Sequence, residues 1–296
     1  MFDAADTAAV VAIQHTIFPE YEKESWHAGG QFDSERVTPY RYVAAAKELL
    51  AYGAVRYLRQ SHGRIDLMVH PRWQRHGIGT NLIKRLLDDL VSTNSVAAHA
   101  RLRGDHEEAL SFLTKHGFKE HHRMYGLELD VGDAKLAKFW PLVNRLAAQG
   151  VKIATFAEER ERDSSCTQKL LDLHNSVLPS WPDPEGVSFT PMVESEFVRK
   201  LEREVADRPD ALFLAKIGEL YVGYSGMFAL GTAVRPEFRG RGIAVALKTH
   251  TVEYAKKIQL QTAMTCTANP AMLAINEKLG YQRRRVEIRM TKPLAQ

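Results

Sequence analysis

The chain has 296 residues, of which 45% are hydrophobic and 26% are charged, and its formal net charge is +4. This balance is typical of a packed globular protein and excludes a disordered, collagenous or coiled-coil chain. No stretch holds the roughly 18 apolar residues of a membrane span, the first residues are acidic where a secretory leader is basic, and positive charge is spread evenly over both halves. We expect two domains in a cytoplasmic protein that acts on neither membranes nor nucleic acid.

The two cysteines, Cys166 and Cys266, are too few for a disulfide framework and lack the paired spacing of a zinc site. We expect a reducing compartment and no bound metal. Cys266 is predicted to be a buried core residue rather than a nucleophile, because no histidine stands at a spacing that would activate it.

The first half shows strand patterns at residues 53–58 and in a run that ends at Val69. Pro71 has no backbone N–H to donate, so it marks the end of the second strand. The two strands are predicted to be antiparallel neighbours. A short turn follows, which consists of Gln74, Arg75, His76, Gly77, Ile78, Gly79 and Thr80.

After this turn, apolar residues four apart predict a helix over 78–90, and a third strand follows over 96–100. The periodic pattern then relaxes. Residues 131–150 contain a short helical stretch that ends in a glycine, and we place the linker between the two halves there.

The second half repeats the same signals in the same order. Val69 and Val234 are separated by the same number of residues as Gly77 and Gly242, so the block matches without a gap. Here the turn consists of Arg239, Gly240, Arg241, Gly242, Ile243 and Ala244. A strand is predicted over 262–266.

The last helix of the second half has its own boundary signals. Asn269 is expected to cap its first turn, and Pro270 is suited to the first helical position. Gly280 is expected at its carboxyl-terminal cap, where glycine adopts the left-handed conformation without strain.

The chemistry of the turn follows from its place between a strand and a helix. The first backbone N–H groups of a helix have no partner within the helix and lie at its positive end, so they can donate hydrogen bonds to phosphate oxygens. Glycines let a ligand approach these amides closely, and the flanking arginines add positive charge. The alternative is an ordinary tight turn. Duplication of the whole block favours a ligand.

Both blocks resemble the GNAT superfamily of acyl-CoA-dependent N-acetyltransferases. The resemblance rests on the pyrophosphate signature Arg/Gln-x-x-Gly-x-Gly/Ala, met at 74–79 and 239–244, and on the block from Asn269 to Gly280. It implies an α+β fold of two tandem domains, each a mostly antiparallel central sheet flanked by helices. The predicted domains are 1–130, a linker 131–150, and 151–296.

The resemblance further implies that acetyl-CoA is the acyl donor and a small-molecule amine the acceptor. The strands around Val234 and Cys266 are expected to splay apart and hold the pantetheine arm, with backbone amides near Val234 polarising the thioester carbonyl. Val69 takes the equivalent position in the first half. The amine must lose a proton before it attacks, and the departing thiolate must be stabilised.

The chain departs from the family pattern at the residue that acts as the acid for the leaving thiolate. Many members place a tyrosine four residues before the glycine that ends the last helix, and here Leu113 and Asn276 stand there. Asn276 is a candidate partner of the sulfur, and Tyr224 is a second candidate acid whose alternative role is structural. A thiol with a pKa near 8.5 can also leave as thiolate or take its proton from water.

The two halves differ in their candidate for the general base. Asp66, three residues before Val69, is the candidate in the first half, with a solvent-facing carboxylate as the alternative, and the second half has Gly231 in its place. The loop containing Trp181, Asp183 and Glu185 is the candidate acceptor pocket, since an aromatic wall with carboxylates suits a cationic amine. A plain surface loop is the alternative.

The second half keeps more of the signature, so we expect it to carry catalysis while the first half binds acyl-CoA weakly or supports the structure. A non-catalytic protein that binds or senses acyl-CoA is the competing hypothesis, because the usual acid is missing from both halves. The repeat carries no signal for one particular amine, acyl chain or oligomeric state.

Overall fold

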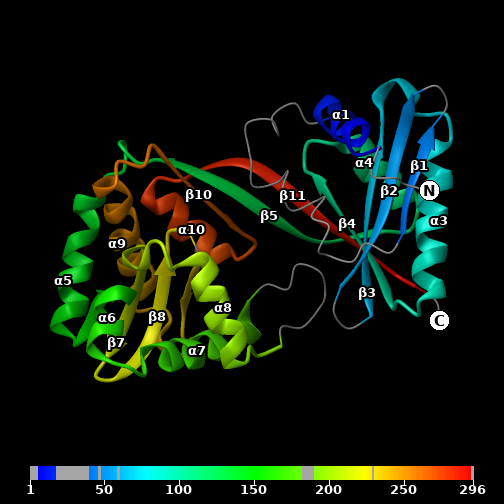
Figure 1. Ribbon diagram of the computed structural model, residues 1–296. Coiled ribbons are helices and arrows are strands. Elements are labelled where there is room, and N and C mark those ends of the chain that lie inside the picture. The colour runs from blue at the N-terminus through cyan, green and yellow to red at the C-terminus, as the bar shows by residue number, and fades with distance from the viewer. Residues whose placement is uncertain are drawn as a thin grey trace. The chain divides into compact units, whose positions relative to one another are not determined.

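The computed structural model describes residues 6–17, 40–45, 48–58, 61–181, 190–228 and 230–294 (Figure 1). The chain forms two compact units. Unit 1 holds the described residues up to His122 and those from Ile288 onward, and unit 2 holds the described residues from Arg123 to Glu287. The division of the sequence at 130 and 150 stays a prediction. Within the described ranges, no helix is both long and apolar enough to cross a membrane.

Unit 1 alternates strands and helices. In chain order its elements are α1 (Thr7–Ile17), β1 (Tyr40–Ala45), β2 (Leu49–Tyr57), β3 (His62–Val69), the short helix η3 (Pro71–Trp73), α3 (Ile78–Ser92), β4 (Ala97–Arg103) and α4 (Glu107–Lys115). The long strand β5 (Lys119–Asp130) begins in unit 1 and continues into unit 2.

Unit 2 repeats the order strand, turn, helix, strand, helix after an additional helical segment. Its elements are η4 (Leu136–Phe139), α5 (Trp140–Ala148), β6 (Val151–Thr155), α6 (Phe156–Arg162), α7 (Cys166–Val177), η5 (Leu178–Ser180), α8 (Glu194–Glu204), η6 (Pro209–Ala211), β7 (Leu212–Ile217), β8 (Leu220–Gly226), β9 (Thr232–Val234), η7 (Pro236–Phe238), α9 (Ile243–Lys257), β10 (Thr262–Thr267) and α10 (Pro270–Leu279). The last strand, β11 (Gln282–Pro293), begins in unit 2 and ends in unit 1.

The strands form one sheet in the order β1-β2-β3-β4-β11-β5-β10 and a second in the order β6-β7-β8-β9. Neighbours β2 and β3 are antiparallel, as are β8 and β9, and this confirms the predicted pairing in each half. The mixed, mostly antiparallel fold class is also confirmed. The sequence did not predict that the first sheet includes β10 and β11 from the second half of the chain.

The helix after each turn forms where the apolar period placed it. Leu82, Leu86 and Leu90 are buried along α3. The predicted caps of α10 are confirmed: the Asn269 side chain accepts from the amides of Ala271 and Met272, and Gly280 adopts a φ of 104°.

The helix expected in the linker is present as α5, and it belongs to the core of unit 2. Leu146 is 2% exposed and shares a hydrophobic cluster with Val234 and Leu247. The segment between the two repeats therefore supports the strand that leads into the second turn.

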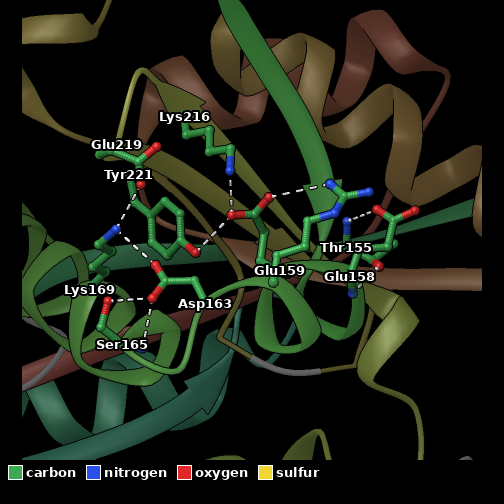
Figure 2. Close-up of polar contacts among 10 residues, drawn as sticks. Thr155, Glu158, Glu159, Asp163, Ser165, Lys169, Lys216, Glu219 and Tyr221 are labelled. Carbon is green, nitrogen blue, oxygen red and sulfur yellow. Dashed lines mark hydrogen bonds and ion pairs between the residues drawn. The ribbon is translucent and has the colours of Figure 1, made fainter.

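A buried carboxylate ties α6 to the neighbouring sheet (Figure 2). Glu159 is 1% exposed, and its Oε2 accepts from Lys216 Nζ at 2.6 Å and from the Tyr221 hydroxyl at 3.0 Å. Lys216 lies on β7 and Tyr221 on β8, so one carboxylate holds three elements together. Burial, followed by the neighbouring Cys166 and Glu159, raises the pKa of Tyr221 above its ordinary value, which keeps the hydroxyl a donor.

Replacing Glu159 with alanine is expected to lower the free energy of unfolding by about 3–5 kcal/mol, because Lys216 and Tyr221 lose their acceptor. Urea denaturation followed by circular dichroism measures this change. The matched control is Glu219→Gln. Glu219 also pairs with a lysine, Lys169, but its side chain is 86% exposed, so the expected cost is below about 1 kcal/mol. Equal midpoints for the two variants would contradict the role given to Glu159.

Candidate functional site

The turn of unit 2 runs from the end of β9 through η7 into α9. Gly240 and Gly242 have φ values of 76° and 90°, in the left-handed region that favours glycine. Gly242 is the residue that caps α9, and it has no side chain to satisfy the first amides of the helix. In unit 1, Gly77 caps α3 in the same way with a φ of 80°.

A side chain at the start of each turn fixes its shape. Arg239 Nε donates to the carbonyl oxygen of Val234 at 3.0 Å, and Gln74 Nε2 donates to that of Val69 at 3.2 Å. The two contacts join equivalent residues of the two copies. The first residue of the signature therefore closes the turn on the strand that precedes it, whether it is arginine or glutamine.

The backbone of both turns is open to a ligand. A Cβ atom added at Gly77 or Gly240 would meet no atom within 4 Å, whereas one at Gly242 would lie 2.9 Å from a methyl group of Leu142. The outer side of each turn thus offers bare amides at the positive end of a helix. This arrangement fits the oxygens of a diphosphate.

The arginines of the second turn are partly engaged within it. Arg239 also donates to the hydroxyl of Ser180. Arg241 lies over the ring of Phe238, 5.0 Å from its centroid, and donates to the carbonyl oxygen of Glu237 at 3.3 Å. Both contacts hold the guanidinium groups next to the turn, where their charge favours an anion.

In unit 1, a groove of about 340 Å³ lies beside the turn. Its lining consists of Arg75 and five residues from α4, namely Glu107, Glu108, Ser111, Phe112 and Lys115. Arg75 itself has a positive φ of 65° at the position that Gly240 takes in unit 2. The two carboxylates make this groove less favourable to phosphate than the turn alone.

The strands that should hold the pantetheine arm separate in both copies. Parallel pairing of β3 with β4 covers three residues, His62, Gly63 and Arg64, and ends well before Val69. In unit 2, β9 ends one sheet and β10 ends the other, so Val234 and Cys266 lie on different sheets. Cys266 is exposed, so the prediction of a core cysteine is wrong. It lies on an outermost strand, where one side of the backbone has no neighbour.

Comparison with known proteins gives the family. The model of the Acetyltransferase (GNAT) family matches residues 8–118 and 170–281. The chain belongs to this family. The residues of both turns fall within the matched ranges, so it is an acetyl-CoA-dependent N-acetyltransferase built from two GNAT repeats.

Relatives and structural neighbours agree with this assignment. The chain is 25% identical over 258 residues to a mycothiol acetyltransferase of Paenarthrobacter aurescens, covering 81% of this chain and 73% of that one. A GCN5-related N-acetyltransferase from Sphaerobacter thermophilus superposes with a TM-score of 0.72 at 15% identity, over 98% and 93% of the two chains. A tandem GNAT protein from the clavulanic acid pathway superposes with a TM-score of 0.56 at 16% identity, over 88% and 85%.

In this GNAT protein, the base predicted for the first copy is held by arginines. Asp66 pairs with Arg56 at 2.8 Å and with Arg64 at 3.6 Å, and its side chain is 16% exposed. Each of its two carboxylate oxygens thus faces a guanidinium group. Its role as a base stays a prediction.

Tyr224, the candidate acid on β8, is fully buried, and its hydroxyl lies 2.9 Å from His174 Nδ1. Burial raises the pKa of Tyr224 above its ordinary value, which makes it a weaker proton donor. Tyr224 is paired with Ala233 in the sheet, and Tyr52 of unit 1 is paired with Met68 at the equivalent position. A buried tyrosine in both copies favours a structural role, and the acid role stays a prediction.

Of the predicted acceptor residues, Trp181 is half-buried and lies edge-on to His174, with ring centroids 5.8 Å apart. It packs on the core formed by α7, α8, β7 and β8. Asp183 and Glu185 lie outside the described residues.

Asn276 is fully buried on α10, and neither its Oδ1 nor its Nδ2 has a hydrogen-bond partner within the described part of the chain. Sequence reasoning did not single out Lys248 on α9, which is also buried, at 6% exposure. The signal was available in the repeat, because the equivalent residue of the first copy is Ile83. A lysine in place of a core isoleucine needs an explanation.

The burial of His174 predicts an acid-sensitive fold. Burial lowers the pKa of its imidazole from the ordinary 6.5 to about 4. Between these values the unfolded chain binds a proton that the folded chain does not bind, so the free energy of unfolding decreases as the pH falls from 6.5 to 4. At about 1.4 kcal/mol per pKa unit, the loss reaches at most about 3.5 kcal/mol.

His174→Gln is expected to flatten this dependence in urea denaturation at pH 4.5 and pH 7. The control is His121→Gln, at an exposed position on β5, which should keep the wild-type slope. A wild-type slope in His174→Gln would exclude His174 as its source.

Proposed function

We propose that the second copy carries out the reaction, passing the acetyl group of acetyl-CoA to the amine of a small molecule. The turn carries this proposal, since it combines a left-handed glycine cap, uncapped amides and a side-chain contact to the preceding strand. In it, Arg239 to Ala244 bind the diphosphate, and the backbone beside Val234 faces the thioester. The relatives named mycothiol acetyltransferase support an amine on a small molecule.

Several features favour the second copy over the first. Asn269 satisfies the first amides of α10, whereas His106 forms no such cap at α4. Glu107 and Glu108 add negative charge beside the first turn, at the groove with Arg75. The buried carboxamide of Asn276 has an apolar counterpart, Leu113, in the first copy. The polar side chains that distinguish the two copies are therefore found in unit 2.

The reaction needs a neutral amine, a polarised carbonyl and a stabilised thiolate. The amine nitrogen attacks the thioester carbon directly, and backbone amides stabilise the oxyanion that forms. For the acceptor side we propose Trp181 as an aromatic wall, with Asp183 and Glu185 attracting the cationic form of the amine. A base, or ordered water, takes the proton of the attacking nitrogen.

A second candidate function concerns the first copy alone, and the observation that supports it is the groove beside Arg75. There we propose weak binding of acyl-CoA through Gln74, Arg75, His76, Gly77, Ile78, Gly79 and Thr80, without turnover. Asp66 lies on the strand that enters this turn, yet its pairs with Arg56 and Arg64 favour a structural role in that copy.

Placing a carboxylate on each turn separates the two copies. Gly240→Glu is expected to abolish transfer and acetyl-CoA binding to unit 2, because the added charge lies where the diphosphate binds. Gly77→Glu is expected to leave turnover within about twofold. Both positions have open space for a side chain, which makes Gly240 a cleaner site than Gly242. Thiol release with a panel of amines and calorimetry with acetyl-CoA give the two readouts.

The neutral control is Gly240→Asn, since asparagine tolerates the left-handed conformation and adds no charge. It separates the effect of charge from that of backbone strain. Loss of turnover in Gly77→Glu with full activity in Gly240→Glu would reverse the assignment of the copies. Absence of any acetyl-CoA binding by the wild-type protein would overturn the proposed function as a whole.

A further inference from the structure

The most unusual group in unit 2 is the carboxamide of Asn276. It is 0% exposed, and both of its polar atoms lack a hydrogen-bond partner among the described residues. Each buried polar atom without a partner costs about 1–3 kcal/mol, and the large majority of buried polar groups are paired. The Asn276 side chain is therefore expected to meet a partner outside the described part of the chain, and a bound ligand would supply one.

A second polar group lies in the same layer of the fold. Lys248 is 6% exposed, and its Nζ lies over the ring of Tyr281, 5.2 Å from the centroid. No hydrogen bond donated by this ammonium is found among the described residues. Burial lowers the pKa of Lys248 to about 8, so the side chain is still mostly protonated at neutral pH.

Helical spacing places the two groups on helix faces that contribute to one hydrophobic cluster. On α9, Val245 and Val252 lie three and four residues from Lys248, and on α10, Leu273 lies three residues from Asn276. All three apolar residues belong to one hydrophobic cluster that includes Tyr281. Residues three or four apart share a helix face, so Lys248 on α9 and Asn276 on α10 each lie on the face that contributes to this cluster.

The first copy fills the same layer with hydrocarbon. Ile83 and Leu113 take the positions of Lys248 and Asn276, and they are 0% and 8% exposed. The packing of the two helices therefore does not require polar groups. An amine and a carboxamide at both positions of one copy, and at neither position of the other, indicate a chemical role in unit 2.

The strands that lead into these helices show where this layer lies. β9 runs through the turn into α9, β10 runs into α10, and each helix contacts its strand. Because β9 and β10 are terminal strands of different sheets, no ladder joins them. A thioester arm held between these strands, with its diphosphate on the turn, would direct its sulfur toward the α9/α10 layer.

We propose that Lys248 and Asn276 form a binding site for the sulfur of CoA, which stabilises the departing thiolate in unit 2. This inference rests on the proposed function. As the amine nitrogen bonds to the carbonyl carbon, the carbon–sulfur bond breaks and its electron pair goes to sulfur. The Lys248 ammonium and the Asn276 amide N–H donate to that thiolate, and the proton lost by the nitrogen reaches it through water. A charged donor in a dry site favours the anion far more than it would in water.

Calorimetry with CoA and with desulfo-CoA, in which hydrogen replaces the thiol group, tests the sulfur site without any acceptor. A charged hydrogen bond contributes about 1.5–3 kcal/mol, so CoA is expected to bind at least about tenfold more tightly than desulfo-CoA at pH 8. Gly77→Glu serves as the common parent, which confines the measurement to unit 2. In Lys248→Met and in Asn276→Leu the ratio of the two affinities is expected to fall to about one.

Lys256→Met, on the same helix, is the matched control and is expected to keep the ratio. Lys256 donates to the carbonyl oxygen of Ala134 rather than projecting toward α10. A wild-type ratio near one, with both ligands bound, would overturn the sulfur site and leave the proposed function standing. Failure of the parent to bind either ligand would instead overturn the proposed function.

Turnover supplies a readout that a structural role would not reproduce. Lys248→Met and Asn276→Leu are expected to lower kcat at least tenfold while the KM for acetyl-CoA changes less than about threefold, because the donors act mainly on the charge formed in the transition state. Lys248→Arg, which keeps a charged donor, is expected to restore part of kcat. Equal losses in the arginine and methionine variants, with folding intact, would contradict the proposal.

Discussion

The geometry of the molecule depends on one backbone constraint, the left-handed glycine that caps the helix after β3 and the helix after β9. With φ values of 80° at Gly77 and 90° at Gly242, the chain reverses sharply enough for the helix to present its first amides outward. A side chain at either position costs about 1–2 kcal/mol of strain. The hydrogen bond from Gln74 or Arg239 to the preceding valine holds this reversal in place.

The second turn is supported more extensively than the first. Leu142 of α5 packs against the backbone of Gly242, and Leu146 of the same helix shares a core with Val234. A segment that the sequence indicates only as a linker thus fixes both ends of the turn. The Arg239 contact to Ser180 adds η5 to this support. A rigid turn fits a role in positioning the donor, since small displacements at a reacting carbon reduce the rate sharply.

Sequence analysis could predict the features that depend on neighbouring residues in the chain. The glycine turn, the caps of α10 and the period of α3 each depend on residues within one short window, and each is confirmed. The sharing of β5 and β11 between the units depends on pairing between distant segments, and local pattern does not encode that register. The exposure of Cys266 escaped prediction for the same reason, because the place of β10 at the end of a sheet is a property of the assembled strands.

Single residues were hardest to predict where the helical pattern continued through them. Lys248 lies among the buried apolar residues of α9, where a single lysine only interrupts the apolar pattern. The comparison with Ile83 in the first copy is what shows that this position belongs to the core. Tyr224 was noticed for its chemistry, but its partner His174, fifty residues away, could be found only from the fold. Buried polar groups that serve structure and those that serve chemistry look the same in a sequence, and the partners of each group distinguish them.

The two copies solve the same folding problem at different cost. A layer of Ile83 and Leu113 contributes hydrophobic burial of roughly 1.5–3 kcal/mol per side chain. In the second copy, Asn276 brings two polar atoms that have no hydrogen-bond partner among the described residues, and Lys248 brings an ammonium that contacts the ring of Tyr281. A chain under selection for stability alone would have kept the hydrocarbon in both copies. Retention of the costlier pair in the copy with the better-formed site follows the general pattern in which stability is given up where chemistry requires it. By this reasoning the first copy is a reference structure within the same chain, against which the role proposed for the polar residues of the second can be tested.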